Sequence, residues 1–89
     1  MSLLDNIQNY YELLVIEALA KEVEGKNMDE DVLTDVLCIA INHLPPRYIR
    51  HEVDMAYYTS PLEREEIEGK ARQAVLNALE FIKKAKKKP

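Results

Sequence analysis

Two adjacent prolines, Pro45 and Pro46, follow a long apolar stretch and constrain this chain more than any other feature. Proline holds φ at about −65° and has no amide hydrogen, so a helix that reaches the pair must end at about Leu44. The chain then leaves as a stiff, polyproline-like segment that carries Arg47 and Tyr48. A forked guanidinium and a flat aromatic ring suit a planar, anionic ligand. We therefore expect a binding site here, and no comparable feature indicates catalysis.

The composition indicates one small domain that spans residues 1–89. Domains of this size bury only about 60–65% of their unfolded surface, so their stability margin is thin. A single cysteine, Cys38, excludes an internal disulfide and offers too few ligands for a structural zinc ion. Oligomerisation is the remaining common source of stability, and we expect a homodimer. The lone cysteine and the lack of a signal peptide or long apolar run predict a cytoplasmic protein without a membrane partner.

The first of three predicted helices covers residues 3–23. Ser2 and Asp5 form a capping-box pattern at its start, and Gly25 ends it. Apolar residues recur at helical spacing between these ends. The apolar stripe is broad enough to cover two sides of the helix, which indicates contact with a second chain. The residues that broaden the stripe are Leu3, Tyr10, Val15 and Leu19.

The second predicted helix begins at Asn27 or Asp29 and ends before Pro45. Acidic residues at its start are favourable beside the positive end of the helix dipole. Its apolar residues surround the helix almost completely, so we expect it to be the most buried of the three.

The third predicted helix has Ser60 as N-cap, Pro61 at its first position and Glu63 as the acidic member of a capping box. We expect its lysine-rich end, residues 83–89, to fray beyond Ala85. Its predicted buried face consists of Ile67, Ala71, Ala74, Val75, Ala78, Leu79 and Ile82.

Residues 45–59 are too apolar for a solvated loop, because they include Val53, Met55, Tyr57 and Tyr58. We expect a short turn of helix or an extended segment there. The predicted fold is therefore all-α, with three main helices and a short irregular or helical segment after the proline pair, in an intertwined homodimer.

The end of the second helix resembles the signature of a known family. Residues 35–48 finish in Asn-His-Leu-Pro-Pro-Arg-Tyr, similar to the Asn-x-Leu-Pro-Pro-x-Tyr motif of the late-competence ComFB family of bacteria. The resemblance extends over about residues 5–85 and implies an all-helical homodimer. Some members of the family are receptors for cyclic dinucleotides, so the resemblance also implies such a receptor here. The positions to which it assigns ligand contact are Asn42, Leu44, Pro45, Pro46 and Tyr48, together with Arg47.

Some members of that family hold zinc through cysteines between the first two helices, whereas residues 25–30 of this chain contain no cysteine. Cys38 and His43 are five positions apart, about 140° around a helix, so they cannot act together as metal ligands or as a nucleophile pair. We expect no metal, no cofactor and no enzymatic activity.

The motif offers chemistry that suits a cyclic dinucleotide, which has two purines, two phosphates and a two-fold axis. Tyr48 could stack on a purine, and Arg47 or Arg50 could present paired donors to guanine or to a phosphate. Arg64, near the start of the third helix, could add a further cation. Cyclic di-GMP is favoured over cyclic di-AMP because an arginine fork matches a guanine edge better than an adenine edge.

Other interpretations remain open. The motif could dock a protein, such as a transcription regulator, in an adaptor of the competence or motility machinery that binds no nucleotide. The lysine tail could contact DNA, although the acidic first half of the chain opposes nucleic-acid binding. In a purely structural interpretation, the prolines have no role beyond ending a helix, and the tyrosines belong to the core. In that interpretation Arg50 and Arg64 do no more than form surface ion pairs with Glu52 or Glu68.

Overall fold

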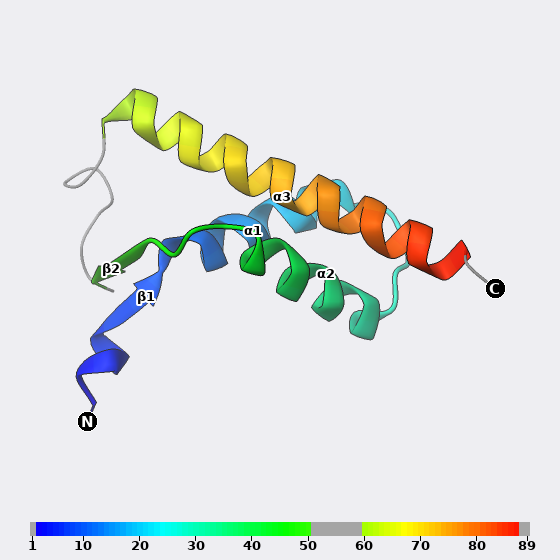
Figure 1. Cartoon of the computed structure of the whole chain (residues 1–89), viewed down its shortest axis with the longest axis horizontal. Helices are drawn as coiled ribbons and strands as arrows, with labels where there is room; N and C mark the ends of the chain where they lie inside the picture. The colour runs from blue at the N-terminus through cyan, green and yellow to red at the C-terminus, as the bar shows by residue number, and fades with distance from the viewer. Residues whose placement is uncertain (1, 51–59, 88–89) are drawn as a thin grey trace.

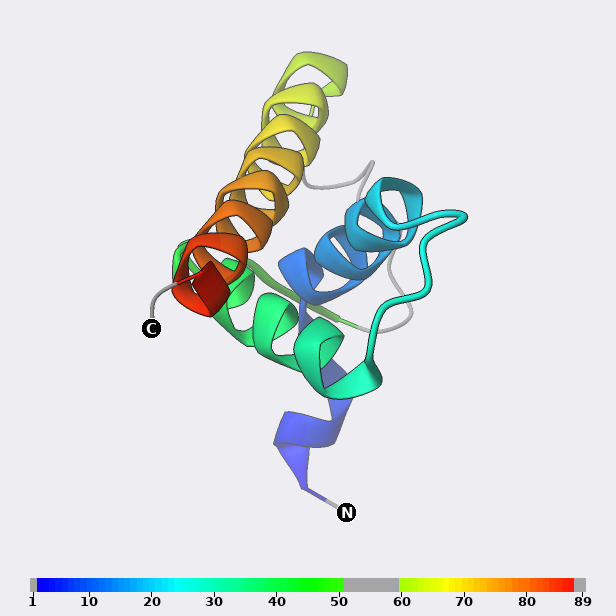
Figure 2. The same cartoon turned by 90° about the vertical axis from the view of Figure 1, so that its right-hand side faces the viewer.

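The computed structural model describes residues 2–50 and 60–87. Three helices form its body, and α3 packs across both α1 and α2, which also contact each other (Figures 1 and 2). This confirms the three predicted helices, and a short two-stranded antiparallel sheet corrects the all-α prediction. The elements in chain order are η1 (Leu3–Asn6), β1 (Ile7–Asn9), α1 (Tyr10–Glu22), α2 (Glu30–Asn42), β2 (Tyr48–Arg50) and α3 (Pro61–Lys87).

The N-terminal segment differs from the single helix predicted over residues 3–23. Ser2 and Asp5 do form a capping box, but it opens only the short 3-10 helix η1. The chain then extends as β1, and Asn9 caps the start of α1. The prediction was wrong here because β1 pairs with β2, a partner that is distant in the sequence. Local helix preference does not reveal such a pairing.

The second helix has the predicted ends but not the predicted burial. Asp29 caps its start, and α2 ends before the prolines. Within the described chain only Val36 and Ala40 of α2 are fully buried, whereas α1 and α3 each bury more residues. The prediction that this helix is the most buried was therefore wrong. Because α2 packs on α1 and α3 along one side, its other apolar side chains are only partly covered.

The core lies where the three helices meet. Val15, Val36 and Val75, one from each helix, are its largest fully buried side chains. The predicted buried face of α3 is confirmed, with Leu79 and Ile82 partly buried at its edge. The core also takes in Val15 and Leu19 of the stripe that was assigned to a second chain. Its buried members are Tyr11, Leu14, Val15, Leu19, Val36, Ala40, Ile49, Ile67, Ala71, Ala74, Val75 and Ala78.

The ends of α1 and α3 compare differently with the prediction. The C-terminal end of α1 leads to Gly25, whose φ of 78° is unfavourable for other residues, so the predicted stop at this glycine is confirmed. The backbone of α3 remains helical to Lys87, beyond Ala85, where the sequence predicts fraying.

Among the described residues, no helix has both the length and the apolar character needed to cross a bilayer. The uncertain stretch after the prolines begins as the extended strand β2, while residues 51–59 lie outside the described chain.

Val75→Ala should lower the free energy of unfolding by about 1–3 kcal/mol, because it removes two methyl groups from a fully buried site and leaves a cavity. Urea unfolding at one protein concentration measures this loss. Leu76→Ala is the matched control, since the side chain of Leu76, which follows Val75 in the sequence, is 38% exposed. An equal loss for both variants would contradict the assigned core.

Candidate functional site

The proline motif begins at the end of α2, where hydrogen bonding changes. The amides of His43 and Leu44 donate to the carbonyl oxygens of Ala40 and Ile41, at 3.2 and 3.1 Å. The two prolines that follow have no amide to continue this pattern. The helix therefore stops as predicted and leaves Asn42 exposed on its last turn.

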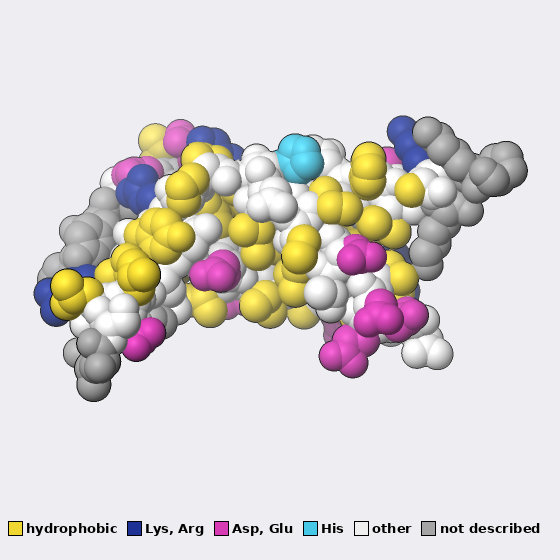
Figure 3. Space-filling view, turned by 60° about the horizontal axis from the view of Figure 1, so that its bottom comes forward, with side chains coloured by type: hydrophobic (Ala, Val, Ile, Leu, Met, Phe, Trp, Pro, Cys, Tyr) yellow, Lys and Arg dark blue, Asp and Glu magenta, His cyan; other side chains and the backbone are white. Residues whose placement is uncertain are grey.

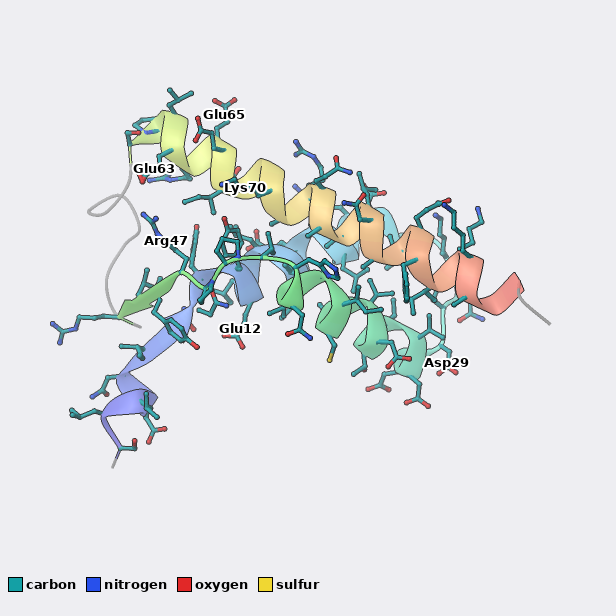
Figure 4. All side chains as sticks on the ribbon, in the orientation of Figure 1. Glu12, Asp29, Arg47, Glu63, Glu65 and Lys70 are labelled. Carbon is teal, nitrogen blue, oxygen red and sulfur yellow. The ribbon has the colours of Figure 1, made fainter. Side chains whose placement is uncertain are left out.

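Arg47 is held by three contacts, each with a different element. Its amide donates to Oδ1 of Asn9 at 2.9 Å, and its carbonyl oxygen accepts from the amide of Tyr10 at 2.6 Å. Its Nη2 donates to Oε1 of Glu63 at 3.3 Å, and Figure 4 shows these two side chains pointing toward each other. Arg47 thus ties the end of β1, the start of α1 and the start of α3 together, which gives this motif arginine a structural role.

The tyrosines at the start of α1 belong to the core, which agrees with the purely structural interpretation of the sequence. Tyr11 is 3% exposed, and Tyr10 is partly buried against the same cluster. Burial raises the pKa of the Tyr11 phenol above its ordinary value, and the positive charge of Arg47 opposes part of that rise. The phenol therefore remains neutral at physiological pH, and neither ring is free to stack on a ligand.

The ion pair between Arg47 and Glu63 should contribute only about 0.2–1 kcal/mol to stability, since its side chains are 39% and 41% exposed. A double-mutant cycle with Arg47→Met and Glu63→Gln, followed by urea unfolding, measures this coupling. The coupling should shrink in about 1 M salt, where the Debye length is about 3 Å. A coupling above about 2 kcal/mol that salt leaves unchanged would contradict the estimate.

The strand β2 places an aromatic ring and a guanidinium side by side on an open surface. Ile49 is only 8% exposed and fastens the strand to the core. Tyr48, at 63%, and Arg50 are exposed on either side of it in the sequence. Alternate side chains of a strand point to the same face, so these two lie about 7 Å apart along it. We call Tyr48 and Arg50 the β2 face.

Leu44 and Pro45 belong to a different feature. They form part of the wall of an open groove of about 710 Å³, which we call the α2–α3 groove. Its other lining residues are Ile39, His43, Lys70, Gln73, Ala74, Asn77, Ala78 and Phe81. The structure thus divides the motif, because the groove includes neither residue of the β2 face. Pro46 is exposed between the two features.

Arg64 lies in the first turn of α3 and is half-buried. Its amide donates to the carbonyl oxygen of Ser60 at 2.9 Å. Its Nε atom is buried and has no hydrogen-bond partner among the described residues. Within the same part of the chain, no ion pair joins it to Glu68. Glu52, the other acidic partner considered for Arg50 and Arg64, lies outside the described residues.

The potential metal ligands are dispersed. Residues 2–50 and 60–87 contain no group of three His, Cys, Asp or Glu side chains that could hold a metal ion. Cys38 is exposed on α2. His43 Nδ1 lies 2.7 Å from the carbonyl oxygen of Ile39, so the imidazole is engaged at the end of its own helix.

Asn9 and Glu63 are the site residues that the sequence-based prediction missed. Oδ1 of Asn9 accepts from the amides of both Tyr11 and Arg47, so one side chain caps α1 and holds the motif. A local signal for the cap existed, because Asn9 precedes Glu12 by three positions, as in a capping box. No local pattern indicates that Glu63, assigned only a capping role, also meets Arg47.

These features define a small protein of three packed helices and a two-stranded ribbon, with an Asn-x-Leu-Pro-Pro-x-Tyr segment between α2 and β2. The profile of the late competence development protein ComFB family matches residues 8–86. The chain belongs to this family, which confirms the resemblance seen in the motif. No significant match was found among curated proteins or among solved structures.

Proposed function

We propose that this protein is a non-catalytic, cytoplasmic receptor that binds a cyclic dinucleotide as a homodimer. Membership of the late-competence family suggests a competence-related role. The observation that carries the proposal is the β2 face, where an exposed tyrosine ring and an exposed guanidinium share one side of a short strand.

The β2 face suits a purine nucleotide. Stacking of a base on the Tyr48 ring is worth about 1–3 kcal/mol. Arg50, on the same side of the strand, can direct two parallel donors at guanine O6 and N7 or at a phosphate. This pairing favours cyclic di-GMP over cyclic di-AMP, because adenine offers no second acceptor on that edge.

The β2 face is also held rigid by packing and hydrogen bonds of neighbouring residues, which lowers the entropy lost on binding. Ile49 is buried in the core between the two residues of the face. The residue before the strand, Arg47, is fixed through its amide by Asn9 and through its side chain by Glu63. In this proposal Arg47 positions Tyr48, and it reaches a ligand only by leaving Glu63.

Two of the remaining predicted contacts, Asn42 and Arg64, are secondary contributors in this proposal. Asn42 is exposed at the end of α2 and can offer its amide to a base edge. The half-buried Arg64 lies at the helix end that attracts anions. Two copies related by a two-fold axis would present two β2 faces, which matches the symmetry of a ligand with two bases.

Titration calorimetry with cyclic di-GMP, cyclic di-AMP and GTP tests the proposal. We expect heat from cyclic di-GMP, a weaker response to cyclic di-AMP and none from GTP. If neither cyclic ligand produces heat or a melting shift at high micromolar concentration, the receptor function fails. An adaptor of the competence or motility machinery, with a protein such as a transcription regulator as its partner, is then the better account.

A further inference from the structure

The N-terminal arm, residues 2–6, carries apolar side chains that the described part of the chain leaves uncovered. Leu3 and Leu4 are 85% and 73% exposed, more than any other large hydrophobic residue of the described chain. The 3-10 helix that bears them packs mainly on β1, and Figure 1 shows it projecting away from the three helices. Residues 3–6 precede the segment that the family profile matches.

This arm is an ordered turn. The hydroxyl of Ser2 accepts from the amide of Leu4, and the Asp5 carboxylate accepts from the amide of Ser2. A capping box of this kind holds the two leucines in a defined arrangement. Because no residue of the arm is buried, the turn gains little from its own chain. It is a preformed apolar surface without a partner among the described residues of its own chain.

The α2–α3 groove offers a complementary surface. Its lining is mainly apolar, and Phe81 on one side of it is 61% exposed. None of the acidic residues within residues 2–50 and 60–87 lines the groove, whereas Lys70 does. Asp5 is the only charged side chain in residues 2–6, so an acidic, apolar arm would meet a mildly basic, apolar groove. Figure 3 shows hydrophobic side chains spread widely over one face of the molecule.

We propose that Leu3 and Leu4 of each chain insert into the α2–α3 groove of a second copy, so that two chains exchange their arms about a two-fold axis. This inference rests on the homodimer of the proposed function and assigns the surfaces that form it. The exchange covers the most exposed leucines and the apolar groove with one contact, and symmetry makes that contact twice. It does not involve the β2 face.

The mass of the protein in solution gives the first test. Size-exclusion chromatography with light scattering, over a range of concentrations, should show a dimer for the parent chain. A double variant, Leu3→Ser with Leu4→Ser, should raise the dissociation constant of that dimer at least about tenfold, and Phe81→Ser should do the same. Leu62→Ser and Leu76→Ser are the matched controls, since they change leucines that are exposed outside the groove. Both should leave the dimer unchanged, and circular dichroism shows whether each variant folds.

Cross-linking gives the second test, in a Cys38→Ser background that removes the only native thiol. One chain carries Leu4→Cys and another carries Asn77→Cys, at the groove. Mixed and mildly oxidised, they should form a covalent pair, whereas Leu62→Cys with Asn77→Cys should not. Failure to form the pair would overturn the arm exchange, as would a disulfide within one chain when both substitutions are combined.

The two tests also separate this inference from the proposed function. A parent chain that is monomeric at every concentration removes both the arm exchange and the proposed homodimer. A dimer whose mass persists in the double leucine variant removes the arm exchange alone. Heat from cyclic di-GMP is measured independently, so the ligand proposal can survive either result.

Discussion

Asn9→Ala is expected to lower the free energy of unfolding by about 2–3 kcal/mol, one of the largest effects of any change to a polar side chain in this protein. The substitution removes the N-cap of α1 and leaves the amide of Arg47 without its acceptor. Loss of a cap costs about 1 kcal/mol, and an unsatisfied, partly buried donor costs about 1–2 kcal/mol more. For a domain of this length the melting temperature should fall by about 8–24 °C.

Thermal and urea unfolding at one protein concentration measure this effect. Asn9→Asp retains an Oδ1 acceptor and should recover most of the loss. Asn6→Ala changes an exposed asparagine nearby, and we expect a change within about 0.5 kcal/mol. If Asn9→Ala were as mild as Asn6→Ala, the double role of Asn9 would be wrong.

Tyr48→Ala should weaken the binding of cyclic di-GMP by about 5-fold to 150-fold, the equivalent of about 1–3 kcal/mol of lost stacking. The melting temperature should change little, because the side chain is 63% exposed and surface substitutions rarely exceed about 0.5 kcal/mol. Titration calorimetry measures the affinity, and thermal unfolding of the same sample measures the stability.

Two controls sharpen this prediction. Tyr48→Phe keeps an aromatic ring and should retain most of the affinity. Ile16→Ala removes another exposed apolar side chain, 53% exposed on α1, and should leave binding unchanged. A large fall in melting temperature for Tyr48→Ala, without a specific loss of affinity, would show that the tyrosine contributes to stability and not to ligand binding.

Features encoded by neighbouring residues were predictable from the sequence. The stop of α2 before Pro45, the cap at Asp29 and the turn at Gly25 each follow from a backbone rule that acts over a few residues. The buried face of α3 follows from its apolar periodicity. Family membership was also readable, because one contiguous motif carries it.

Features that depend on distant partners were not predictable in this way. Residues 7–9 follow a good helix start, yet they are extended because β2 offers backbone partners to them. The apolar residues of α2 look uniform in the sequence, but only Val36 and Ala40 reach full burial. The candidate site was predicted as one continuous motif, and the chain places its two halves in different surroundings.

The amino-acid sequence by itself determined where α1 and α2 stop, which face of α3 is apolar and which family the chain belongs to, since these depend on residues that are adjacent or one helical turn apart. Only the tertiary structure decided that Arg47 is bound to Asn9 and Glu63 while Tyr48 faces outward. The physical reason is that hydrogen bonds and ion pairs between separate elements form only once packing has brought those elements together.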